Sequence, residues 1–202
     1  GAMAAVCACL AGVETLGEAF KDEDIRTLLG KALTEEMPPD AGFSRTENLQ
    51  YAVQVCSYLE NACAGEKWPE MGENLLARYV RAILPAMTEY EQKSAALPRR
   101  LAFAVSALIM LYSGVRPDDQ GVYTLAGKDG SMPVLDRAEA LRAFARLSCD
   151  MPCEALAYAA LSDCEIWGCD LREIEGLEEL ATEQLRDMQL LGVCEAMRKA
   201  SK

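Results

Sequence analysis

The side chains that most often perform acid–base or nucleophilic chemistry are sparse in this sequence. Histidine is absent, which removes the usual general base, the commonest metal ligand and every Ser/His or Cys/His nucleophile pair. Glycine-rich phosphate loops are missing too, so no cofactor-binding motif is predicted. Nine cysteines are present, but their spacings do not give paired CxxC zinc motifs. The closest cysteine pairs are Cys7-x-Cys9, Cys149-x3-Cys153 and Cys164-x4-Cys169. We therefore predict no catalytic residue and no metal site within the chain.

The clearest helical pattern of the sequence lies in residues 74–90. Its apolar residues recur at helical spacing, whereas Asn74, Arg78 and Arg81 fall on the opposite face at positions i, i+4 and i+7. The family resemblance given below implies that Asn74, Arg78 and Arg81 bind the substrate, and an arginine fork suits a carboxylate. The alternative is that these arginines only solvate the helix and pair with nearby acids. Both readings stay open for Arg78, and the solvated reading is favoured for Arg81. Pro85 should kink this helix, because it cannot donate to the carbonyl of Arg81.

Helix signals dominate the rest of the chain. A helix is expected from Asp22 to Met37, ended by Pro38-Pro39, with the pair Glu35-Glu36 on its solvated face. The next helix should begin at a capping box, Ser44 to Glu47, and bury one apolar stripe. The residues of that stripe are Leu49, Ala52, Val53, Cys56 and Leu59.

A buried central helix is expected after Pro98, because the segment 101–112 is apolar on every side except Ser106 and is too short to cross a bilayer. The loop 116–133 contains a short hairpin around 127–130. A second capping box, Asp136 to Glu139, should open a helix to about residue 147, and further helices are expected at 152–161 and 178–191. The prediction is an all-α fold, a single helical domain of about eight helices with one short β-hairpin in a loop.

Composition limits the classes of partner. The chain has 202 residues, enough for one domain, and a net charge of −12 without any basic cluster, so binding to nucleic acid or to a membrane surface is not expected. Its cysteines occupy apolar helical positions and no leader sequence is recognised, which favours reduced thiols and a cytoplasmic protein. Residues 1–3 (Gly-Ala-Met) are interpreted as a tag remnant, so the domain is expected to span residues 4–202.

Five segments, in order along nearly the whole chain, resemble the mannitol dehydrogenase family of polyol-specific long-chain dehydrogenases, and in particular its tagaturonate reductase (altronate oxidoreductase) branch. They are LAGVETLGEAFKDE (10–23), KALTEEMP (31–38), NLLARYVRAILP (74–85), LPRRLAFAVSALIMLYSG (97–114) and LSDCEIWGCDLREIEGL (161–177).

The resemblance implies a helical C-terminal domain whose partner is its own N-terminal dinucleotide-binding domain, with the active site between them. It also implies NAD as the cofactor of the full-length enzyme, none bound by this domain alone, and a sugar acid as substrate. The family's catalytic motif, Lys-x4-Asn-x2-His, is expected just upstream of Met3, so the chain alone should be inactive.

The resemblance also singles out substrate-binding positions. Asn74 matches the family directly, and Arg78 stands where the family has a lysine that faces the sugar. A family arginine thirteen residues earlier is replaced by Gly65, and either Lys67 takes its place or the substrate preference differs. Trp167 is interpreted as a packed loop anchor.

Three readings of the whole chain remain open. The first is the domain of a tagaturonate reductase, and the second is the same domain of a mannitol or fructuronate dehydrogenase. The third is a non-catalytic helical interaction module. An apolar face left exposed by a missing domain could also let the chain form a homodimer.

Overall fold

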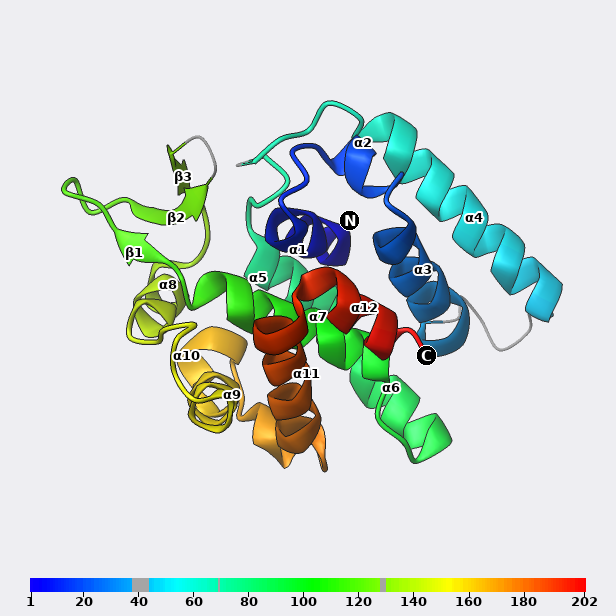
Figure 1. Cartoon of the computed structure of the whole chain (residues 1–202). Helices are drawn as coiled ribbons and strands as arrows, with labels where there is room; N and C mark the ends of the chain where they lie inside the picture. The colour runs from blue at the N-terminus through cyan, green and yellow to red at the C-terminus, as the bar shows by residue number, and fades with distance from the viewer. Residues whose placement is uncertain (38–43, 69, 128–129) are drawn as a thin grey trace.

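The computed structural model describes residues 1–37, 44–68, 70–127 and 130–202, and within these ranges the chain is mostly helical with one small sheet (Figure 1). The all-α prediction is confirmed, although the helical segments are shorter and more numerous than expected. The helices outside the regions discussed below are α1 (Ala2–Ala11), α2 (Leu16–Ala19), α3 (Glu23–Lys31), α9 (Cys153–Ser162), α10 (Cys164–Trp167), α11 (Leu177–Leu191), α12 (Val193–Ala200) and the 3₁₀ turn η3 (Leu171–Glu173).

Helix α7 (Arg99–Tyr112) is the centre of the fold, with every residue from Arg100 to Ile109 buried. It packs against α1, α9, α11 and α12 (Figure 1). The apolar residues that predicted a central helix therefore meet a neighbouring helix on each side. The hydrophobic burial of this one segment joins the N-terminal, middle and C-terminal parts of the chain into a single core.

The N-terminus of α7 is capped from a distant segment. The Glu36 carboxylate, on the π-helical turn η1 (Ala32–Glu36), accepts hydrogen bonds from the backbone N–H of Arg100 at 3.1 Å and of Leu101 at 2.9 Å. The Arg100 guanidinium pairs with both Glu35 and Glu36. Our prediction that this acidic pair is solvated was wrong for Glu36, which is 3% exposed. A carboxylate at the positive end of a helix dipole satisfies orphan N–H groups, which offsets part of the cost of burying it.

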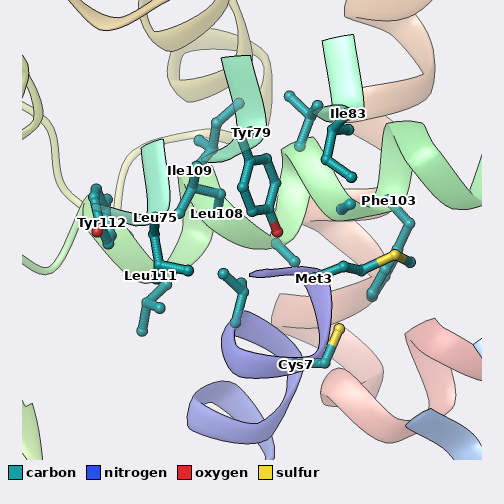
Figure 2. Packing of buried hydrophobic residues seen from close by; sticks show 14 of the residues in the cluster. Met3, Cys7, Leu75, Tyr79, Ile83, Phe103, Leu108, Ile109, Leu111 and Tyr112 are labelled. Carbon is teal, nitrogen blue, oxygen red and sulfur yellow. The ribbon is translucent and has the colours of Figure 1, made fainter. Parts of the chain in front are cut away.

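The segment 74–90 forms three consecutive helical pieces, α5 (Leu75–Arg78), the π-helical turn η2 (Tyr79–Ile83) and α6 (Leu84–Ser94). Pro85, at the start of α6, has no N–H to donate to the carbonyl of Arg81. The N–H of Leu84 donates to the carbonyl of Tyr79, five residues earlier, as in a π-helix. The expected distortion at Pro85 is therefore confirmed, and it takes the form of a wider turn. The predicted apolar face is buried at Leu76, Tyr79, Ile83 and Met87 and partly buried at Val80; Figure 2 shows Tyr79 and Ile83.

Helix α4 (Arg45–Ala62) begins at the predicted capping box, with reciprocal hydrogen bonds between Ser44 and Glu47. Its predicted core stripe was only partly correct. Ala52 is buried, but Leu49 and Val53 are 59% and 56% exposed. The reason is its position at the edge of the molecule (Figure 1), where it contacts α2, α3 and η1 along one side only.

Asp136 does not cap its own helix, which corrects the second predicted capping box. Helix α8 (Ala138–Ala145) has Arg137 at its N-cap without a side-chain hydrogen bond. The Asp136 carboxylate accepts hydrogen bonds from the Leu76 N–H at 2.8 Å and from the Tyr112 hydroxyl at 3.0 Å. It thus caps α5 and fixes it to α7, because buried long-range donors compete successfully with a local cap.

The predicted hairpin is present and carries an additional short strand. Strands β1 (Arg116–Pro117), β2 (Tyr123–Gly127) and β3 (Gly130–Pro133) form an antiparallel sheet in that order. Leu125 on β2 packs into the core. Residues 128–129 of the predicted hairpin and the predicted helix end at Pro38-Pro39 lie outside the described residues.

The N-terminal residues take part in the fold. Ala2 and Met3 form the first turn of α1, and Met3 is 5% exposed in the core beside Phe103 (Figure 2). Their interpretation as a tag remnant remains a prediction, but they are not outside the folded domain. None of the described helices combines the length and apolar character needed to cross a membrane.

Candidate functional site

A cavity of about 310 Å³ lies at the N-terminal end of α1. Side chains from α1, the end of α2, α3, η1, α4 and η2 form its walls, and nearly all of them are apolar. They include Met3, Phe20, Leu29, Leu33, Leu59 and Ile83. The guanidinium of Arg78, at the end of α5, is the charged side chain among the lining residues. The geometry is that of an apolar pocket with one fixed cation.

The Arg78 guanidinium is held from one side. Its Nη1 donates to the backbone carbonyls of Met71 at 3.2 Å and Glu73 at 3.3 Å. Its Nη2 lies beside Gly1, where an added Cβ would stand 3.7 Å from that nitrogen. Within the described residues Arg78 has no ion pair, and Nη2 has no hydrogen-bond acceptor. The half-buried fork therefore keeps donors available for an anionic ligand.

The backbone before Arg78 explains this position. Asn74 has a left-handed conformation, with φ of 50°, at the start of α5, and asparagine tolerates that conformation better than most residues. Its N–H donates to the carbonyl of Leu135 at 2.8 Å. The sharp turn folds the carbonyls of Met71 and Glu73 back under the guanidinium. Asn74 itself is exposed, with its side chain 3.5 Å from the Glu73 carboxylate, so its role here is to shape the turn.

Lys67 lines a different cavity, of about 490 Å³, at the other end of α1. It pairs with Thr15 in an isolated β-bridge, and Leu16 N–H donates to the Glu66 carbonyl at 3.0 Å. These contacts fix the loop that carries Lys67 to the C-terminal end of α1. Ten helical residues, about 15 Å along the axis, separate the two ends. The structure does not bring Lys67 and Arg78 into one cavity.

Arg81 is exposed and lines neither of these two cavities. The expected i, i+4, i+7 face assumed α-helical geometry through position 81. The π turn η2 has more residues per turn, so Arg81 rotates away from the direction of Arg78. Arg81 has no ion pair within the part of the chain that the structure describes. Its exposure agrees with the solvated interpretation, but the expected pairing with a nearby acid is not observed.

The other residues that line the cavity beside Arg78 could not be predicted from the sequence. Leu59 and Cys56 come from α4, and Met37 from the end of η1, through long-range packing. Trp167, predicted as a packed anchor, is 2% exposed and its indole N–H donates to the Ala160 carbonyl at 2.8 Å. All nine cysteines are free thiols.

Comparison with known proteins gives the chain its relatives. No family model matches it. It is 32% identical over 196 residues to the altronate oxidoreductase of Klebsiella pneumoniae (strain 342), covering 95% of this chain and 38% of that protein. It is 28% identical over 201 residues to the altronate oxidoreductase of Halalkalibacterium halodurans, covering 95% of this chain and 37% of that protein. The chain thus spans well under half the length of these relatives.

The fold agrees. The mannitol 2-dehydrogenase of Pseudomonas fluorescens, solved as a ternary complex with NAD and D-mannitol, superimposes with a TM-score of 0.72 at 11% identity, over 98% of this chain and 38% of that one. A D-sorbitol dehydrogenase in substrate-free form gives a TM-score of 0.68 at 13% identity, over 97% of this chain and 37% of that one. The resemblance drawn from the sequence is therefore confirmed by both sequence relatives and fold.

Proposed function

Since the chain is a relative of the altronate oxidoreductases and shares the fold of the mannitol dehydrogenase family, we propose that it is the substrate-side domain of an NAD-dependent oxidoreductase. The reaction would be hydride transfer between NAD(H) and a hexuronate or the corresponding aldonate, as in a tagaturonate reductase. The sequence relationship to altronate oxidoreductases over 95% of the chain is the observation that carries this proposal.

The chemistry itself would reside in the rest of a longer protein. The relatives are more than twice as long as this chain, which leaves room for a dinucleotide-binding domain and for the Lys-x4-Asn-x2-His motif. The exposed apolar residues Leu49 and Val53 on α4 offer a surface for that domain. This chain alone would not bind NAD and would not turn over substrate.

Arg78 would hold the carboxylate of the sugar acid. Its anchored Nη1 fixes the plane of the guanidinium, and its free Nη2 lies at an apolar cavity where a charge-assisted hydrogen bond is stronger than in water. Neutral polyols would lack this interaction. Asn74 contributes through the turn that aims Arg78, whereas Lys67 and Arg81 lie outside this cavity and have no direct part in the proposal.

The test is NADH oxidation by the longer protein that contains this chain, with tagaturonate, fructuronate and fructose as substrates. We expect tagaturonate to be the preferred substrate. Arg78→Ala should raise KM for it and lower kcat/KM by about 10- to 100-fold, the worth of a hydrogen bond to a charged group. Arg78→Lys should recover part of this loss.

Arg81→Ala is the matched control, because it removes the same charge from the same helical path outside the cavity. It should change kcat/KM less than about twofold. If no sugar acid is reduced, the proposed function fails. If Arg78→Ala and Arg81→Ala have equal effects, the assignment of the carboxylate to Arg78 fails.

A further inference from the structure

Two cysteines stand apart from the other seven by their exposure. Cys164 and Cys169 are exposed, whereas Cys7 and Cys153 are buried and the remaining five are partly covered. Burial raises the pKa of the Cys7 thiol to about 12 and that of Cys9 to about 11, so these two are poor nucleophiles near neutral pH.

The chain between the two exposed thiols is one tight turn. Cys164 is the first residue of α10, Gly168 ends this helix in a left-handed conformation with φ of 84°, and Cys169 follows directly. The Gly168 N–H bonds to the Cys164 carbonyl at 2.9 Å. This single bond, from the left-handed residue back to the first residue of the helix, closes the turn and brings the backbone just before Cys169 next to Cys164.

The turn is also held rigidly. The Trp167 indole N–H donates to Ala160, the Asp163 carboxylate accepts from the Glu165 N–H at 2.8 Å, and the Arg137 guanidinium donates to the Ile166 carbonyl. The two thiols are therefore presented on a fixed scaffold. Partial burial, followed by the Cys164 thiol, raises the pKa of Cys169.

We propose that Cys164 and Cys169 form a reversible intramolecular disulfide when a low-molecular-weight disulfide, such as glutathione disulfide, is the oxidant. A thiolate of the pair attacks the oxidant, forming a mixed disulfide and releasing one glutathione thiolate. The second cysteine then attacks the protein sulfur of the mixed disulfide and releases the second glutathione. The two protein thiols lose two protons and two electrons, and the S–S bond of the oxidant is reduced to two thiols.

The test is equilibration of the 202-residue chain with mixtures of glutathione and glutathione disulfide, followed by acid quenching and digestion with a protease that cleaves after glutamate. Cleavage at Glu165 separates the two cysteines, so residues 155–165 and 166–173 stay joined only through a Cys164–Cys169 bond. We expect this joined peptide in the folded chain. The effective concentration of one thiol at the other, obtained from the glutathione ratio at half oxidation, should be at least about tenfold higher in the folded chain than in the urea-unfolded chain. The reason is that the turn pre-orients the sulfurs.

Two variants give the matched controls. Gly168→Ala strains the left-handed position, while its Cβ would meet no atom within 4 Å, so it should lower the effective concentration toward that of the unfolded chain. Cys164→Ala should leave Cys169 as a mixed disulfide with glutathione. The proposal is overturned if the folded chain shows only glutathione adducts, or if folding gives no advantage over the unfolded chain.

Discussion

The hydroxyl of Tyr79 allows a direct test of the packing described above. The Tyr79 side chain is fully buried, with its ring between η2, α7 and α1 and its oxygen directed toward α1 (Figure 2). No described protein group forms a hydrogen bond with this hydroxyl. Burial raises the pKa of Tyr79 well above its ordinary value of 10.0, so the hydroxyl stays protonated and polar. An unpaired buried hydroxyl costs folding free energy.

The perturbation is Tyr79→Phe, which removes one oxygen and keeps the ring. An unsatisfied buried polar group costs about 1–3 kcal/mol, and the small space left by the oxygen offsets part of the gain. We expect the free energy of unfolding to rise by about 1 kcal/mol. For a domain of this size that corresponds to an increase in Tm of about 2–4 °C, measured by calorimetry with urea unfolding as a second assay.

Tyr112→Phe is the matched control and should have the opposite sign. Tyr112 is equally buried, but its hydroxyl donates to Asp136 at 3.0 Å, and Asp136 also caps α5. Its removal should lower the unfolding free energy by about 1–3 kcal/mol. If Tyr79→Phe destabilises the chain as much as Tyr112→Phe does, the Tyr79 hydroxyl has a strong partner and the reasoning is refuted.

Three further predictions concern stability and association. Burial raises the pKa of Glu36 above 4.5 despite its hydrogen bonds, so the folded state binds this proton more readily than the unfolded state. We therefore compare the unfolding free energies of the wild type and of Glu36→Gln as a difference, wild type minus variant. This difference should increase as pH falls from 7 through the folded pKa of Glu36. A difference that stays constant between pH 7 and 4.5 would contradict this. A Cβ at Gly30 in α3 would meet no atom within 4 Å, whereas a Cβ at Gly17 would stand 2.7 Å from the backbone of Ala64. Gly30→Ala should stabilise the chain by about 0.5–1 kcal/mol and Gly17→Ala should destabilise it by about 1–3 kcal/mol, in the same urea assay, and equal effects would refute the packing. Finally, if the exposed face of α4 mediates association, sedimentation velocity should show a coefficient that rises with concentration for the wild type and stays constant for Val53→Glu; loss of folding in the variant is checked by circular dichroism.

Local chemistry in the sequence predicted local structure well. The capping box at Ser44 and the distortion at Pro85 follow from hydrogen bonds that neighbouring residues can or cannot make. The apolar run of α7 predicted a buried helix, because such a run is stable only when covered on all sides. These features need no knowledge of distant segments.

Choices between partners distant in the sequence were beyond prediction. Asp136 and Glu36 both carry signals for local or solvated roles, but each caps a helix elsewhere in the chain. Likewise, the periodic stripe of α4 cannot indicate that the helix lies at the edge with Val53 exposed. A pattern in one helix states which face is apolar, and the packing of the other helices decides whether that face is covered.

The candidate site shows the same limit with a functional consequence. Helical periodicity placed Arg78 and Arg81 on one face, but Arg81 lies in the π turn before Pro85 and does not line the cavity that Arg78 lines. The loop contacts at Thr15 then place Lys67 at the opposite end of α1. Gly65 carries no charged side chain. In the cavity at the N-terminal end of α1, Arg78 is therefore the cationic side chain among the lining residues. If a sugar-acid carboxylate binds here, its recognition depends on one guanidinium fork, and substitution of that single residue should remove the preference for acids over neutral polyols.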